Sequence, residues 1–282
     1  MGFFSKKKEV PKQENPEFLK LVEKWDDFLH KMETRFNESL VNAKEALLDN
    51  LEESDYDITP TMTAWFSIKQ QLMALGNKVD TTFDEKVLPQ MRAYKEDYEL
   101  LDQRLKVRHL REDVIFKKID LFEIEVEGEV SQRFYNHAIQ FLNKDFNCTQ
   151  CSAKLEVRKD IFRSHYVSCD YCNTVNTFMP NDKISQIRWV VDNIAKYNSI
   201  NEWKAKENAE NEYKKLRSRS EGEDINQYKI AIKNWEDSLR TYWNKYFTLR
   251  SEFLPEYAET IAHDTDVKMK SFYEQRKRDL NY

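Results

Sequence analysis

Glycine and proline are scarce in this chain, and this scarcity constrains its fold more than any other feature. Four Gly and six Pro occur in 282 residues, whereas an average protein carries roughly 12% of the two together. Folds rich in β-strands need these residues at their many turns. The glycines stand far apart, at Gly2, Gly76, Gly128 and Gly222, which excludes the glycine-rich phosphate loops. We therefore expect a mainly α-helical chain.

Two long apolar stripes with a helical period support this expectation. The first contains ten apolar residues between Phe18 and Leu51 at a mean step of about 3.7 residues, which places them on one face of a helix. Such a helix is about 50 Å long, more than twice the ~19 Å radius of gyration of a compact chain of this size. We therefore predict an elongated bundle of coiled-coil-like hairpins.

The second stripe runs from Trp65 to Leu105 and follows a break at 54–57. Together the two stripes predict an antiparallel helical hairpin. Pro89 lies inside the second stripe and should interrupt the helix just before itself. The tryptophans of the stripes, such as Trp25 and Trp65, are expected in the core or in seams between helices.

The remaining elements are predicted from shorter patterns. Residues 122–126 alternate apolar side chains with Glu and end before Gly128, which predicts a short strand. Ser131 should then cap a helix that runs to Phe141. Further helices are expected over 184–194 with a cap at Asn181 or Asp182, over 202–222 with much exposed surface, over 228–249, and over 256–279 after Pro255. The predicted segments are a disordered N-terminus (1–16), two helical regions (17–145 and 181–282) and a cysteine module between them (146–180).

The four cysteines form the clearest chemical motif in the chain. Cys148 and Cys151 are separated by two residues, as are Cys169 and Cys172, and 17 residues lie between the pairs. This spacing is typical of zinc sites, because each C-x-x-C turn brings two thiolates to one ion and two turns complete a tetrahedral shell. A closed shell of four thiolates leaves no open position for water, so we predict a structural Zn²⁺ rather than a catalytic one.

Residues 146–180 resemble a zinc ribbon of the rubredoxin-like type through these cysteines and the strand-like spacer between them. The resemblance implies structural zinc and a role in binding protein or nucleic acid. The family usually has Gly or Pro in or just after each knuckle, where this chain has Ser152-Ala153 and Asn173-Thr174. Asn tolerates the left-handed conformation that such a turn needs.

Several alternatives remain open for the cysteines and for other motifs. Iron fits the same cage, the cysteines could form a redox pair or carry no ligand, and His165 is expected on a strand face rather than as a ligand.

His263-Asp264 resembles the His-Asp pair of metal-dependent phosphohydrolases, although a capping or solvated position is the simpler interpretation. The basic stretch 104–118 and the cluster Lys214, Lys215, Arg217 and Arg219 are candidate phosphate contacts.

The net charge and the N-terminal residues limit which partners and which cellular compartment we expect. The formal net charge is −5, so no global field attracts nucleic acid. No apolar run has the ~20 residues of a membrane span, and the first residues lack a secretory apolar region. We expect a cytoplasmic protein with reduced thiols.

These observations favour a non-enzymatic zinc-binding scaffold or adaptor that contacts a protein partner, a second copy of itself included. The second hypothesis is a nucleic-acid-associated accessory protein that uses residues 104–118 and the zinc ribbon. A metal-dependent hydrolase is the third.

Overall fold

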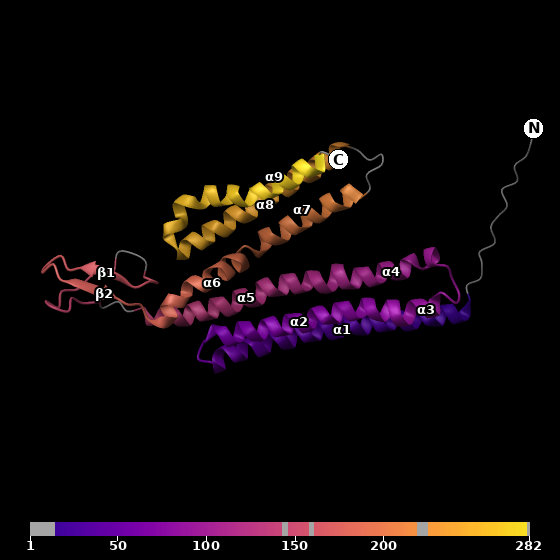
Figure 1. Ribbon diagram of the computed structural model, residues 1–282, viewed down its shortest axis with the longest axis horizontal. Coiled ribbons are helices and arrows are strands. Elements are labelled where there is room, and N and C mark those ends of the chain that lie inside the picture. The colour runs from indigo at the N-terminus through magenta and orange to yellow at the C-terminus, as the bar shows by residue number, and fades with distance from the viewer. Residues whose placement is uncertain (1–14, 143–145, 158–160, 219–224, 281–282) are drawn as a thin grey trace, which may run out of the picture. The chain divides into compact units, whose positions relative to one another are not determined.

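The computed structural model describes residues 15–142, 146–157, 161–218 and 225–280. These residues are mostly helical and include one two-stranded sheet, which confirms a mainly α fold with a small inserted β element (Figure 1). They form two compact units. Unit 1 holds the described residues up to Ala46 and Thr63–Phe122, and unit 2 holds Leu47–Met62 and those from Glu123 onward. The predicted division at 16, 145 and 180 stays a prediction, and residues 1–14 of the predicted disordered segment lie outside the described residues.

The first helix, α1 (Pro16–Glu53), contains the first apolar stripe. Asn15 caps it by accepting a hydrogen bond from the Glu17 N–H at 2.9 Å. Pro16, at the first helical position, has no N–H and therefore leaves no donor without an acceptor. The stripe is buried along its length, with exposed fractions between 0 and 6% at the following residues: Phe18, Trp25, Met32, Phe36, Ala43, Leu47 and Leu51.

Helix α2 (Ile58–Thr82) returns antiparallel to α1, as predicted. The turn between them contains Asp55 and Tyr56 with positive φ angles of 52° and 59°. Within unit 2 the Thr61 hydroxyl lies 2.9 Å from the Asn50 side chain, and within unit 1 the Trp25 and Phe83 rings lie 5.5 Å apart. The end of α1 thus contacts the start of α2, and the first half of α1 contacts the residue that follows α2, so the two helices form an antiparallel hairpin.

Pro89 interrupts the second helix as expected. A π-helical turn (Phe83–Val87) follows α2 and leads into the short α3 (Leu88–Met91), which contains the proline near its start. Proline has no N–H and clashes with the preceding turn, and a π turn accommodates both effects because it widens the helix locally.

A third helical run completes unit 1 and continues into unit 2. It consists of a 3₁₀ turn (Asp97–Leu100), α4 (Leu101–Arg108), a π segment (His109–Phe116), α5 (Lys117–Ala138) and a 3₁₀ turn (Ile139–Phe141). Two ion pairs attach it to α1 in unit 1. Lys106 lies 2.6 Å from Asp26, and Lys118 lies 3.6 Å from Glu33.

The predicted strand at 122–126 and the predicted cap at Ser131 are wrong, because both lie inside α5. The alternation with Glu coincides with a helical stripe of buried residues three or four apart: Ile119, Phe122, Val126, Val130 and Phe134. Gly128 allows α5 to approach α6 closely, since an added Cβ would lie 2.2 Å from the Cβ of Tyr197. Ser131 is fully buried and accepts a hydrogen bond from Asn193 at 3.3 Å.

The remaining helices of unit 2 match the predicted positions closely, except that residues 219–222 of the predicted helix 202–222 lie outside the described residues. They are α6 (Asp182–Asn198), α7 (Ile200–Ser218), α8 (Ile225–Phe253), a 3₁₀ turn (Pro255–Thr260) and α9 (Ile261–Leu280). Asn181 caps α6 by accepting from the Lys183 N–H at 2.9 Å. Helix α7 is largely exposed or half-buried, and Tyr213 attaches it to α8 by stacking on Trp235 at 5.0 Å. Among the described helices, none is long and apolar enough to cross a membrane.

Candidate metal centre

The cysteine module is built from two hairpins in unit 2, and each hairpin turn is a C-x-x-C knuckle. Asn147 and Lys154 form a single antiparallel bridge around the first knuckle. Strands β1 (His165–Ser168) and β2 (Val175–Phe178) pair antiparallel around the second, with Ser168 opposite Val175. The structure therefore agrees with the predicted ribbon that has a knuckle at each hairpin end.

The fold brings the four cysteine sulfurs together. All four Sγ atoms lie within 4.8 Å of one another, with 3.5 Å between Cys148 and Cys172 and 3.6 Å between Cys151 and Cys169. A tetrahedral ion with metal–sulfur bonds of about 2.3 Å places its sulfurs about 3.8 Å apart. Disulfide sulfurs lie only about 2.05 Å apart, and all four cysteines are free. The arrangement fits one metal ion.

The backbones of the two knuckles have the same conformation. In each, the residue after the second cysteine has a φ of 60°, at Ser152 and at Asn173. The N–H of that residue donates to the carbonyl of the first cysteine at 2.9 Å, in both Cys148 and Cys169. Asn173 thus adopts the left-handed conformation expected of it. Ser152 adopts the same conformation without the local side-chain hydrogen bonding that favours it in Asn.

The hydrogen bonds at the sulfurs control their ionisation. The backbone N–H groups of Cys151 and Gln150 lower the pKa of Cys148 to about 6. Hydrogen bonds from Thr174 lower the pKa of Cys172. The Ala153 N–H lowers the pKa of Cys151, but the neighbouring thiols and burial outweigh it and raise that pKa to about 12. Thiolates this close together repel one another, and a cation at their centre would favour the ionised form.

Asn176 supports the centre from β2, and nothing in the sequence pattern indicated this role. Its side chain is buried, and its Nδ2 lies 3.6 Å from the Cys148 sulfur. Its Oδ1 accepts hydrogen bonds from the backbone N–H and the hydroxyl of Thr149, both at 2.9 Å. Asn176 thereby attaches the first knuckle to the second hairpin. Groups of this kind orient the ligands of metal sites.

The two histidine motifs of the sequence lie outside this cluster. His165 lies on β1, as predicted, and its Nδ1 lies 3.0 Å from the Arg163 carbonyl oxygen. Asp264 lies in the first turn of α9 and accepts a hydrogen bond from the Thr260 hydroxyl at 2.8 Å. Within the described ranges, the four cysteines are the one group of His, Cys, Asp or Glu that gathers around a common point.

The basic stretch 104–118 is neutralised within unit 1. Each of its six bases lies within 4.0 Å of a carboxylate, in the following pairs: Arg104–Asp84, Lys106–Asp26, Arg108–Glu112, Arg111–Asp80, Lys117–Asp113 and Lys118–Glu33. In the second basic cluster, Lys214 and Lys215 pair with Glu210 and Glu212. Arg219 and the side chain of Arg217 lie outside the described residues.

No family model, curated protein or solved structure matches this chain. The resemblance to a zinc ribbon rests on the four cysteines, their two knuckles and the short sheet.

Proposed function

We propose that this chain is a non-enzymatic cytoplasmic adaptor in which a structural Zn²⁺ ion holds a small binding module together. The ligands would be Cys148, Cys151, Cys169 and Cys172. Four thiolates in a near-tetrahedral cluster suit Zn²⁺, and they fill its coordination shell, which leaves no place for a catalytic water. Zinc would supply the positive charge that lets the four sulfurs ionise together.

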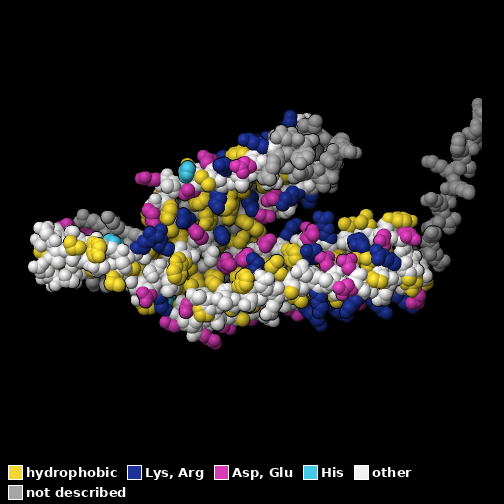
Figure 2. Space-filling model, in the orientation of Figure 1, with side chains coloured by type: hydrophobic (Ala, Val, Ile, Leu, Met, Phe, Trp, Pro, Cys, Tyr) yellow, Lys and Arg dark blue, Asp and Glu magenta, His cyan; other side chains and the backbone are white. Residues whose placement is uncertain are grey.

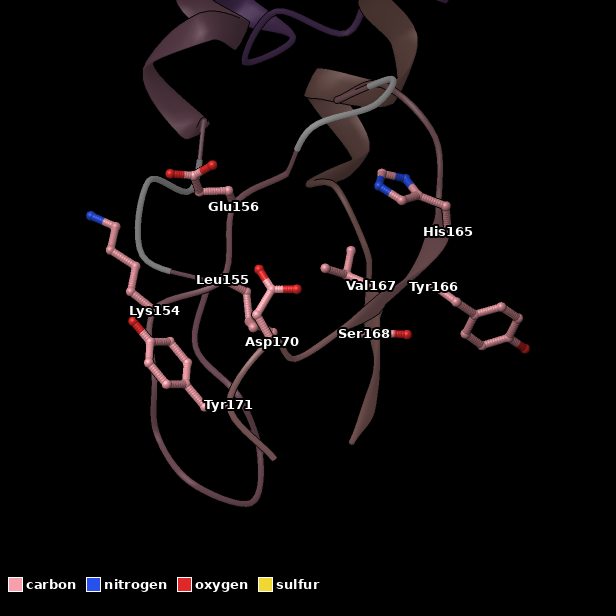
Figure 3. Close-up of a pocket in the computed structure, with 9 residues that line it drawn as sticks. All are labelled: Lys154, Leu155, Glu156, His165, Tyr166, Val167, Ser168, Asp170 and Tyr171. Carbon is pink, nitrogen blue, oxygen red and sulfur yellow. The ribbon is translucent and has the colours of Figure 1, made fainter. Parts of the chain in front are cut away.

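The observation that carries the adaptor proposal is the exposed apolar surface of this module. Four large apolar side chains lie 61–80% exposed within fourteen residues: Tyr166, Tyr171, Val175 and Met179. Tyrosine and methionine are enriched where proteins bind each other. In Figure 2 the visible face of the module, at the left, shows some apolar side chains and few Lys or Arg, whereas the helices carry apolar side chains together with charges of both signs. In Figure 3 the Tyr166 ring points away from the strands.

The ion pairs of the basic stretch 104–118 count against the nucleic-acid hypothesis. Binding to phosphates gains its free energy when Lys and Arg displace counterions from the polymer. The six bases of 104–118 already pair with carboxylates of their own unit. A protein partner, a second copy included, is therefore better supported. The hydrolase hypothesis gains no support from His263 and Asp264, since among the described residues only the four cysteines gather around a common point.

Partner binding is tested with a double variant, Tyr166→Ser with Tyr171→Ser, in the zinc-loaded chain. Tyr98→Ser is the matched control, because Tyr98 is 79% exposed but lies in unit 1. Light scattering and quantitative affinity capture measure self-association and partner binding, and mass spectrometry measures the bound metal. We expect one zinc in all three proteins, and a partner that only the double variant loses.

Two results would contradict the proposal. A wild-type chain that stays monomeric and retains no partner would remove its basis. A tightly bound nucleic acid that high salt releases would instead favour the second hypothesis.

A further inference from the structure

An exposed apolar stripe runs along α4 and the 3₁₀ turn before it, in unit 1. Its members Tyr98, Leu101 and Leu105, here called the α4 stripe, are 79, 56 and 49% exposed. Their spacing of three and four residues places them on one side of this helical run. The opposite side faces the core through three residues that are 0–5% exposed: Leu100, Val107 and Leu110. The packing of α4 within unit 1 therefore leaves the stripe uncovered.

A carboxylate lies in the middle of the α4 stripe. Asp102 is exposed and stands one helical turn from both Tyr98 and Leu105. It has no ion-pair partner within the part of the chain that the structure describes. The neighbouring bases are neutralised in ion pairs of their own: Lys106–Asp26 and Arg108–Glu112. The surface therefore suits an occupant that carries apolar side chains close to a positive charge.

The N-terminal segment of the same chain has this chemistry. Residues 1–14 lie outside the described residues, and their sequence places Phe3 and Phe4 just before three lysines at 6–8. The whole segment contains four lysines against two glutamates, a formal charge of +2. Its two aromatic rings match the apolar stripe, and its lysines match the unpaired Asp102.

The attachment point of this segment lies close to the α4 stripe. The segment joins the chain at Asn15, which caps α1, and the Phe18 ring of the first turn lies 6.3 Å from the Tyr94 ring. Tyr94 precedes the first member of the stripe by four residues. Fourteen extended residues reach up to about 46 Å, whereas the stripe spans only about 10 Å of helix. Residues 3–8 can therefore reach all of it.

The size of the stripe favours a tethered occupant over a second copy of the chain. Three side chains with these exposed fractions offer roughly 400 Å² at most, whereas each partner of a stable complex buries about 800 Å². A tethered segment does not need that area, because a short flexible attachment gives it an effective concentration in the millimolar range.

We propose that residues 3–8 bind the α4 stripe of the same chain. The rings of Phe3 and Phe4 cover Leu101 and Leu105, and one of the lysines at 6–8 pairs with Asp102. The contact needs no helix or strand in the segment. It is separate from the adaptor function, because none of these residues belongs to the cysteine module.

A photo-crosslinking residue at position 4 tests this contact in the full zinc-loaded chain. p-Benzoylphenylalanine replaces Phe4, the protein is irradiated, and mass spectrometry of the digest identifies the crosslinked peptides. We expect the main crosslink to join position 4 to residues 98–105. The same photo-crosslinking residue in place of Phe66, which is 63% exposed on α2, is the control and should not reach residues 98–105.

Variants of the stripe establish which side chains hold the segment. Leu101→Ser with Leu105→Ser should lower the crosslinking yield at least about fivefold, because both apolar contacts are lost. Asp102→Asn should lower it about threefold, as expected for one exposed ion pair. Val41→Ser is the matched control, since Val41 is 59% exposed on α1, and should leave the yield unchanged. Circular dichroism verifies that each variant keeps its helices.

The same experiment distinguishes the other possible occupants. A mixture of isotopically light and heavy chains shows whether a crosslink forms within one chain or between two. Crosslinks within one chain support the proposal, whereas crosslinks mainly between light and heavy chains assign the stripe to a second copy and overturn it. A yield that the double serine variant leaves unchanged also overturns it. So does the absence of a crosslink to α4 in a chain whose Phe3 and Phe4 bind phosphatidylserine vesicles, because the segment then serves a membrane.

Discussion

Replacing Cys169 with Ser should unfold the cysteine module and leave the helices intact. Cys169 is 1% exposed and belongs to a small cluster with Cys148, in which Leu155 is the one buried apolar side chain that is not a cysteine. Burying one Leu contributes about 1.5–3 kcal/mol, whereas a structural zinc site contributes about 10–16 kcal/mol of folding free energy. The metal therefore contributes several times more than this apolar contact.

The helices should survive because two apolar clusters of the C-terminal helices include no residue of the module. The cluster around Trp235 and Met269 and the cluster around Tyr246 contain residues from 195 onward only. The described part of 146–180 contains no helix, so its loss should leave the ellipticity at 222 nm nearly unchanged.

Circular dichroism, metal analysis and limited proteolysis test this prediction together. We expect bound zinc to fall from one equivalent to near zero, with new proteolytic cleavage confined to 146–180. Tyr166→Ser, which changes an exposed side chain of the same module, should keep its zinc. Loss of a third or more of the helical signal in Cys169→Ser would refute the reasoning, as would full retention of zinc.

Substitutions at four further positions test the knuckles, the packing of α5 and a buried tyrosine. Ser152→Gly should tighten zinc binding by about 0.5–1 kcal/mol in a chelator competition, because glycine adopts a φ of 60° without strain, and Asn173→Ala should weaken it by a similar amount. Gly128→Ala should lower the free energy of unfolding by about 1–3 kcal/mol in a urea titration, because its Cβ would clash with Tyr197, whereas an open helix site would gain stability. Burial, with a smaller contribution from a nearby carboxylate, raises the pKa of Tyr242 to about 12. The unfolded chain then releases this proton at lower pH than the folded one, so up to about 2.7 kcal/mol of stability present below pH 10 is lost as pH rises to 12. Denaturant titrations from pH 9 to 12 should show this loss in the wild type and a smaller one in Tyr242→Phe.

The sequence was sufficient for features that depend on neighbours along the chain. The apolar stripe of α1, the cap at Asn181 and the interruption at Pro89 are local, because helices form between residues three or four apart. The arrangement of the cysteines was predictable for the same reason. Each knuckle closes within a few residues, and Cys148 and Cys172 lie only 24 positions apart.

Local patterns failed where distant packing decides the outcome. Residues 122–126 fit both a strand period and a helix period, and the burial of Phe122 and Val126 along α5 selects the helix. Ser131 resembled a cap in the sequence, but it lies in the middle of α5 beside Asn193, 62 residues away. Asn176 has no sequence signature, because its role arises from contact with Thr149 across the module.

The mainly helical class, most helix boundaries and the cysteine motif can be read from the amino-acid sequence, because each depends on residues within a few turns of chain. Which surfaces remain available for binding depends on the folded arrangement. The bases of 104–118 are neutralised in part by carboxylates up to 85 positions away, such as Glu33 and Asp26. The exposure of Tyr166 and Tyr171 is likewise known only once the sheet has formed. Burial and charge pairing depend on which distant segments meet, and no local pattern encodes that.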